Sequence, residues 1–263
     1  MSSYAYMVGG VAFVFIMTCL GSATVFFFHK PVTPKFRQIF LGFAAGIMIA
    51  AAVWSLLIPA MEEAETAGVV EWLPIMLGFA LGVLFLLSLD HLIPHLHPFT
   101  NQREGGKRSS KRSALILSAI ILHNIPEGIA VGLSFALVAG HNGSAAAYAP
   151  AIALAIGIGI HNFPEGATIS LLFRQEGAST LKSFLWGCLA GAVDLFFAVL
   201  TIFFAAWLLP AMPWLLAFAA GAMLYVVVEE LIPEAHMGAH SHMGTLAVMA
   251  GFLLMMALDI ALG

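Results

Sequence analysis

The sequence predicts an all-α integral membrane protein with eight transmembrane helices in a 3+2+3 inverted-repeat arrangement and both termini outside. Of its 263 residues, 61% are hydrophobic and only 9% are charged, whereas soluble domains have about 25% charged residues. Apolar stretches of about 20 residues, the length that crosses a bilayer, recur along nearly the whole chain. Two short sequence elements also recur in stretches of opposite direction, as inverted-topology repeats require. These observations exclude an ordinary soluble domain.

Eight apolar stretches are long enough to form membrane-spanning helices within a single domain, residues 1–263. They cover roughly residues 5–28, 36–60, 71–94, 113–139, 147–173, 182–209, 212–233 and 243–262. The first stretch has no basic region before it and exceeds the apolar core of a signal peptide, so it is predicted to be retained. Cys19 and Cys188 both fall inside apolar stretches, which favours small core residues over a disulfide.

The positions of the basic residues predict the orientation of the chain. All ten Lys and Arg residues lie between stretches one and two, three and four, or five and six: Lys30, Lys35, Arg37, Arg103, Lys107, Arg108, Lys111, Arg112, Arg174 and Lys182. The positive-inside rule places these loops in the cytoplasm and both termini outside. Residues 95–112 then form a cytoplasmic His-bearing and basic loop. Its basic part, residues 103–112, has no interleaved aromatic residues, so it is interpreted as a linker and not as a nucleic-acid surface.

The second loop is acidic and faces outward in this topology. Its carboxylates are Glu62, Glu63, Glu65 and Glu71. They could form a vestibule that concentrates cations, or they could be a solvated loop end; the sequence leaves both open.

A repeated element supports the inverted arrangement. Phe-Ala-Ala-Gly-Ile-Met at 43–48 is echoed by Phe-Ala-Ala-Gly-Ala-Met at 218–223, and Leu-Ile-Pro follows each copy, at 57–59 and 231–233. The predicted topology gives the second and seventh stretches opposite directions. A pseudo-twofold axis in the membrane plane that exchanges them would also exchange the fourth and fifth stretches.

The fourth and fifth stretches carry a duplicated polar motif. His-Asn-Ile-Pro-Glu-Gly at 123–128 returns 38 residues later as His-Asn-Phe-Pro-Glu-Gly at 161–166. A His and a Glu four apart on a helix share one face, about 6 Å apart along the axis, and the Asn flanks the same stripe. Two such helices brought together would gather two imidazoles, two carboxylates and two amides. Such groups are costly in hydrocarbon and usually mark an ion or substrate path.

The residue types in this motif favour a divalent transition metal. Imidazole nitrogen with carboxylate oxygen suits Zn(II), and also Fe(II), Mn(II), Co(II) or Ni(II). Glu127 and Glu165 are the expected bridging ligands, because a carboxylate has two oxygens. Asp194 is the single acid in the sixth stretch, and a lone buried Asp is costly without a partner. We therefore expect Asp194 to complete the site.

The third and seventh stretches end alike at the predicted cytoplasmic side. Asp-His-Leu-Ile-Pro-His-Leu-His at 90–97 resembles Glu-Glu-Leu-Ile-Pro-Glu-Ala-His at 229–236. This similarity predicts an exit relay that hands metal to the cytosol, with weaker candidates at His236, His240 and His242; its expected ligands are Asp90, His95, His97, Glu229 and Glu230. The alternative is that polar residues at helix ends simply meet water. Asp259, near the end of the last stretch, is expected to be structural or interfacial.

These motifs together resemble the ZIP family of divalent-metal transporters, in particular its bacterial zinc-uptake members. The resemblance rests on the doubled His-Asn-x-Pro-Glu-Gly, on Phe-Ala-Ala-Gly-x-Met and on Glu-Glu-Leu-Ile-Pro-Glu, and it covers essentially the whole chain. It implies a homodimer and an alternating-access mechanism, in which the bundle with the fourth and fifth helices moves against a scaffold with the second and seventh.

The resemblance also implies a binuclear site at mid-membrane. One ion would be held by His123, Glu127, His161 and Glu165, with Met48 nearby. The second would be held by Asn124, Asn162 and Asp194, with Glu127 and Glu165 as bridges.

The predicted function is inward transport of Zn(II), with Cd(II), Fe(II), Mn(II) and Co(II) as further substrates and no prosthetic group. The expected location is the lipid bilayer of a bacterial plasma (inner) membrane, with no nucleic-acid partner. An intramembrane metalloenzyme is the alternative from another class. It is disfavoured because the chain has no His-Glu-x-x-His motif and no apparent catalytic nucleophile. A non-transporting metal sensor is a third possibility.

Overall fold

The computed structural model describes residues 3–27, 33–70, 72–92, 95–96, 103–104, 112–140, 145–175, 177–235 and 242–262. Within these residues the chain is helical, apart from a short antiparallel ladder between β1 (His95–Leu96) and β2 (Arg103–Glu104). In this ladder His95 lies opposite Glu104, and Leu96 opposite Arg103. The predicted all-α class is confirmed for the described part of the chain.

Sixteen helical elements occur among the described residues. In chain order they are α1 (Ser3–Ser22), η1 (Ala23–Phe26), α2 (Pro34–Ala51), η2 (Ala52–Leu57), α3 (Ile58–Thr66), α4 (Trp72–Leu92), α5 (Arg112–Gly140), η3 (Ala145–Tyr148), α6 (Ala149–Gln175), α7 (Thr180–Phe203), α8 (Ala205–Leu208), η4 (Leu209–Ala211), α9 (Met212–Val226), η5 (Val227–Leu231), α10 (Ile232–Ala235) and α11 (Met243–Leu262).

Seven helices among the described residues are long and apolar enough to cross a membrane. They are Tyr4–Phe26, Gln38–Thr66, Trp72–Leu92, Ala146–Arg174, Thr180–Phe203, Ala205–Leu231 and Met243–Ala261. The remaining predicted stretch, 113–139, corresponds to α5, whose described apolar part is the shorter helix Asn124–Gly140. The chain is therefore an integral membrane protein by the length and composition of its helices.

Capping residues and prolines explain several helix ends. Thr33 caps α2 by accepting a hydrogen bond from the Phe36 N–H, and Ser179 caps α7 by accepting one from the Lys182 N–H. The predicted sixth stretch, 182–209, was too long, because α7 ends at Phe203. The apolar composition continues through this turn, so composition did not mark it; Pro210 and Pro213 mark only the starts of η4 and α9.

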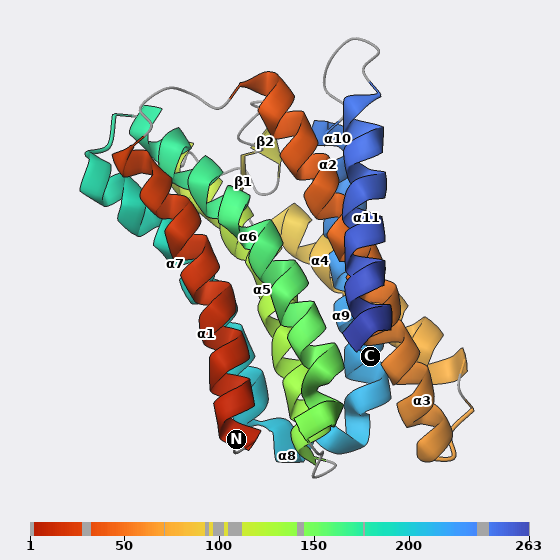
Figure 1. Ribbon diagram of the computed structural model, residues 1–263. Helices are drawn as coiled ribbons and strands as arrows, with labels where there is room; N and C mark the ends of the chain where they lie inside the picture. The colour runs from red at the N-terminus through yellow and green to blue at the C-terminus, as the bar shows by residue number, and fades with distance from the viewer. Residues whose placement is uncertain are drawn as a thin grey trace.

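The long helices form two groups (Figure 1). In one group α1 packs on α6 and α7, and α5 packs on α7. In the other, α2 packs on α11, and α4 packs on α9. The groups meet where α5 contacts α9 and where α6 contacts α2 and α11. Figure 1 also shows that α1 begins and α11 ends at the same end of the molecule, together with α3 and α8, while β1, β2 and α10 lie at the opposite end.

The repeated Phe-Ala-Ala-Gly element makes the same contact in two helix pairs. In the pair of α2 and α11, Gly46 lies against the backbone of Val248, and Gly251 lies against the carbonyl of Phe43. The pair of α9 and α4 repeats this packing: its glycines Gly221 and Gly82 lie against the carbonyls of Phe79 and Phe218, respectively. None of these four positions has room for a Cβ, so glycine is required for the close approach.

A π-helix follows each copy of this element. η2 begins six residues after Gly46, and η5 begins six residues after Gly221; both end immediately before an Ile-Pro. Pro59 and Pro233 have no N–H, so the carbonyls four residues earlier lose their α-helical partner. A π register at these points accommodates the change, and π-segments often occur at functional sites.

We predict that Gly251→Val destabilises the protein, because the new side chain would meet the backbone of α2. Overpacking of this kind costs about 1–3 kcal/mol. The thermal midpoint of the detergent-solubilised protein, followed by size-exclusion chromatography, should fall. Gly9→Val is the matched control, since a Cβ at Gly9 meets no atom within 4 Å. An equal loss in both variants would contradict the packing explanation.

Candidate metal centre

Two continuous helices carry the duplicated motif. α5 contains Pro126 and α6 contains Pro164, and both remain helical through the proline. The motif residues of each copy therefore keep helical spacing and face a common interior. The glycine that ends each motif allows a third helix to approach: Gly128 lies against the backbone of Asp194 on α7, and Gly166 lies against that of Thr18 on α1.

Glu127, His161 and Glu165 form a cluster that could hold a metal ion. Each offers one ligand atom, and these atoms lie within 4.8 Å of one another. His161 Nε2 and Glu127 Oε1 are 3.1 Å apart, and the two side chains are 3% and 0% exposed. Within the part of the chain that the structure describes, this is the only such group of three or more His, Cys, Asp or Glu residues. The sequence prediction for these three residues is consistent with their positions.

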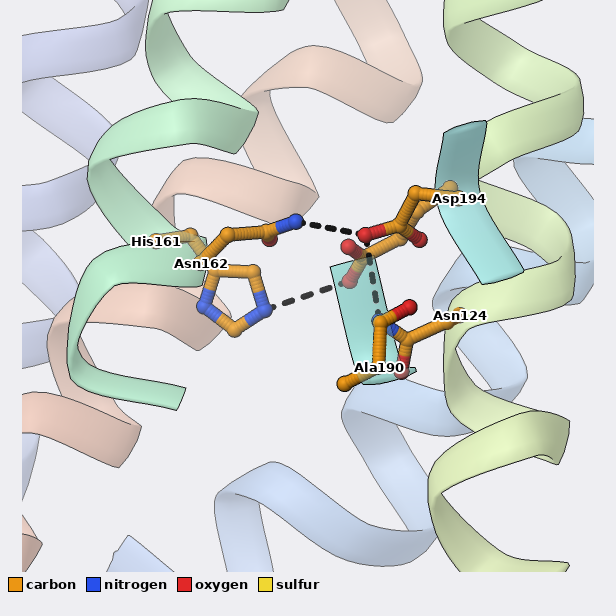
Figure 2. Close-up of polar contacts among 6 residues, drawn as sticks. Asn124, His161, Asn162, Ala190 and Asp194 are labelled. Atoms are coloured by element: carbon orange, nitrogen blue, oxygen red, sulfur yellow. Dashed lines mark hydrogen bonds and ion pairs between the residues drawn. The ribbon is translucent and has the colours of Figure 1, made fainter. Parts of the chain in front are cut away.

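A second group of polar side chains surrounds the Asp194 carboxylate. Asn124 Nδ2 donates to Asp194 Oδ2 at 3.1 Å, and Asn162 Nδ2 donates to the same oxygen at 2.7 Å. Figure 2 shows the amides of both Asn124 and Asn162 directed at this carboxylate. Asn124 Nδ2 also lies 3.4 Å from the Ala190 carbonyl oxygen. All three polar side chains are buried.

Three oxygen atoms of this second group lack a hydrogen-bond donor among the described residues. They are Asn124 Oδ1, Asn162 Oδ1 and Asp194 Oδ1. An acceptor buried without a donor is destabilising by about 1–3 kcal/mol, and by more when it is charged. Amide and carboxylate oxygens are also ligands for divalent cations. A cation at this position would satisfy all three.

The two groups are electrostatically connected. The charges of Glu127 and Glu165 both act on Asp194, so three acids share one buried region. Taking such charges out of water is costly unless they are paired. One imidazole, His161, contributes at most one positive charge. Divalent cations would supply the missing positive charge and are the simplest partners for this arrangement.

Two further predicted ligands are only partly placed. His123 belongs to α5 one turn before Glu127, but its side chain lies outside the described residues. Met48 is fully buried in α2, within the main apolar core.

The predicted exit relay is partly described. Asp90, on α4, is 8% exposed and accepts a hydrogen bond of 3.1 Å from the Tyr225 hydroxyl of α9. Glu229 is exposed and Glu230 partly buried, both in η5. The backbone of His95 lies in β1, and the exposed His242 precedes α11. The side chain of His95, together with residues His97, His236 and His240, lies outside the described part of the chain.

Sequence reasoning missed Tyr225. Its position four residues before Glu229 puts it on the same helical face as this acid, a spacing that could have drawn attention to it. By hydrogen-bonding to Asp90, it joins the acidic end of α4 to the helix that leads into η5.

A second hydroxyl–carboxylate pair occupies the matching place in the other helix pair. Ser55 Oγ donates to Asp259 Oδ1 at 2.8 Å, and the side chains are 2% and 7% exposed. Asp259 follows Gly251 by eight residues, as Asp90 follows Gly82. Burial and this hydrogen bond favour the structural alternative for Asp259. The common spacing from glycine to Leu-Asp was the missed sequence signal.

The sequence of the chain is similar to those of known zinc transporters. The ZIP zinc transporter family matches residues 100–259. Zinc transporter ZIP11 of Homo sapiens is 33% identical, over 97% of this chain and 96% of its own length. Zinc transporter ZIPB of Bordetella bronchiseptica is 36% identical, over 98% of this chain and 82% of its own. Zinc transporter GufA of Myxococcus xanthus is 37% identical, over 80% and 81%. With its buried donor cluster in apolar helices and these similarities along nearly its full length, the chain belongs to the ZIP zinc transporter family.

Proposed function

We propose that this protein moves divalent transition-metal ions, above all Zn(II), across a membrane into the cytoplasm. The observation that carries the proposal is the cluster of Glu127, His161 and Glu165 on α5 and α6, of which the first two are buried and the third is partly buried, in a chain with seven helices apolar enough to span a bilayer among its described residues. Mixed nitrogen and oxygen donors suit Zn(II). Membership of a transporter family removes the metalloenzyme alternative.

The site is proposed to be binuclear. The first position uses Glu127, His161 and Glu165, together with His123 from the preceding turn of α5. Asn124, Asn162 and Asp194 provide the second position through the oxygens that have no donor among the described residues. Glu127 and Glu165 bridge the two ions. Each carboxylate has two oxygens, and both groups lie close enough to Asp194 for their charges to act on it.

The topology is proposed to contain eight transmembrane helices in a 3+2+3 inverted repeat, with both termini outside. The reciprocal glycine contacts in the pairs α2–α11 and α4–α9 support it, as do the matching π-helices η2 and η5. In this orientation α3, which carries the exposed Glu62 and Glu65, faces outward as a cation-attracting vestibule. Asp90, His95, His97, Glu229 and Glu230 line the inner mouth.

Transport is proposed to follow alternating access. The group that holds the donor cluster, α1 with α5, α6 and α7, moves against α2, α4, α9 and α11. The two groups touch where α5 meets α9 and where α6 meets α2 and α11. Small buried residues of α2 and α9, such as Ala44, Ala45, Ala219 and Ala220, keep side-chain interlocking low in the second group. A homodimer in the plasma membrane completes the proposal.

Glu127→Ala and Glu165→Ala are each expected to reduce zinc uptake by about 100-fold or more, because each removes a first ligand of the ion. Glu127→Gln keeps the side-chain shape and should fail as well, since it lacks the charge. Saturable Zn(II) accumulation in proteoliposomes is the measurement, and Lys35→Ala, exposed on α2, is the control. Wild-type rates in both alanine variants would refute the site.

Asp194→Ala should lower the number of Zn(II) ions bound per chain from two to one, measured by equilibrium dialysis. The substitution removes the carboxylate that accepts from both asparagines and supplies an oxygen to the second position. It should also change the preference among Zn, Cd, Fe, Mn and Co in competition flux. Asp194→Asn keeps the size but not the charge and should behave alike; two bound ions in both variants would remove Asp194 from the site.

Uptake should be slower at an external pH of about 5 than at about 7, because protons compete with the metal for His and Glu ligands. Lower pH protonates these ligands, and a protonated ligand does not bind. The measurement is the initial Zn(II) flux with the driving gradient held fixed. Equal or faster uptake at the lower pH would speak against ligand protonation as the limiting effect.

A further inference from the structure

α1 and α7 approach each other closely along a stripe of small residues. Ser22 Oγ of α1 donates to the Phe184 carbonyl of α7 at 2.8 Å. Two glycines of α7 lie against the same face of α1, Gly187 against Ser22 and Gly191 against Thr18. The spacing of the two helices is therefore fixed both by a hydrogen bond and by close packing.

Two cysteines face each other within this stripe. Cys19 follows Thr18 on α1 and Cys188 follows Gly187 on α7, so the close approach of the two helices brings the thiols near enough to interact; both are free and partly buried. Each has an exposed leucine as its neighbour in sequence: Leu20 is 53% exposed and Leu189 is 37% exposed. The pair thus lies at the edge of the helix interface, next to the lipid-facing surface. The sequence had indicated only two separate core residues.

The donor set at this pair is limited to two sulfurs. Among the described residues, no third His, Cys, Asp or Glu joins them in a metal-binding group. The nearby hydroxyls are engaged, because Ser22 donates to Phe184 and Thr18 donates to the Val14 carbonyl. Structural zinc sites need four ligands, so Zn(II) is a poor fit. Two thiolates suit a soft ion that accepts linear, two-coordinate binding.

The net charge of the complex further limits which soft ion fits between the two thiolates. Two thiolates with a divalent ion form a neutral complex, whereas a monovalent ion such as Cu(I) would leave a net negative charge. A net charge in an apolar environment is costly. Soft divalent ions of the Hg(II) type meet both requirements, and neutral HgCl₂ can reach the pair from the lipid side.

We propose that Cys19 and Cys188 form a binding site for a soft divalent ion of the Hg(II) class, which bridges α1 and α7. When HgCl₂ binds, each S–H bond breaks and its proton passes to water, the two Hg–Cl bonds break and release two chloride ions, and two S–Hg bonds form. No electron is transferred. The site is separate from the cluster of Glu127, His161 and Glu165 and does not depend on the transport proposal.

The first test counts thiols in the full-length protein in detergent. HgCl₂ is added in steps, and the remaining thiols are labelled with a membrane-permeant maleimide and counted by intact mass. One Hg(II) per chain should protect both cysteines. Protection of only one cysteine per Hg(II), with two ions needed for both, would overturn the proposal, because the thiols would then bind independently.

The second test compares retention of Hg(II) in Cys19→Ser, Cys188→Ser and the double variant. Two linked ligands bind about 100-fold more tightly than one, or better, through their effective concentration. Each single variant should therefore lose Hg(II) to a monothiol competitor at about 100-fold lower competitor concentration than the wild type. The double variant gives the background from other donors, and its elution as a single species in size-exclusion chromatography verifies folding. Equal retention in wild type and single variants would contradict a bridged ion.

Discussion

The structure depends on how the negative charges of three acidic side chains are compensated inside apolar helices. The charges of Glu127 and Glu165 act on Asp194; Asp194 and Glu127 are buried, and Glu165 is partly buried. One oxygen of Asp194 takes the amide donors of both asparagines, so its other oxygen and the two amide oxygens have no donor among the described residues. Protein hydrogen bonds thus orient the site without saturating it. The oxygens that remain without a donor are therefore available to bind a cation.

The surrounding fold holds these acids in place with backbone contacts more than with large side chains. Gly128 brings α7, and with it Asp194, against α5, while Gly166 brings α1 against α6. In the other helix group, the two Phe-Ala-Ala-Gly elements repeat the same reciprocal glycine packing. Each element is followed by a π-helix. η2 carries Ser55, and η5 carries Glu229 and Glu230. The polar chemistry therefore depends on close helix approach throughout.

Motif spacing was sufficient to predict that Glu127, His161 and Glu165 lie together, because residues four apart share a helical face. Their role as metal ligands stays a prediction. The position of Asp194 followed from the cost of a lone buried acid. The end of α7 at Phe203 could not be read from a continuous apolar run. The π-helices and the Tyr225–Asp90 and Ser55–Asp259 pairs were also missed, because they depend on which helices become neighbours. Likewise, Cys19 and Cys188 are 169 residues apart, and only tertiary packing brings their thiols together.

The equivalence of Asp90 and Asp259 bears on how direction arises in such a molecule. Each lies eight residues after a glycine of the reciprocal packing, and each accepts a hydrogen bond from a hydroxyl of the neighbouring π-containing helix. In the proposed inverted repeat, turning the molecule upside down would exchange these two buried hydroxyl–carboxylate pairs. A difference between the two ends then comes from residues that the repeat does not share, such as the exposed Glu62 and Glu65 of α3.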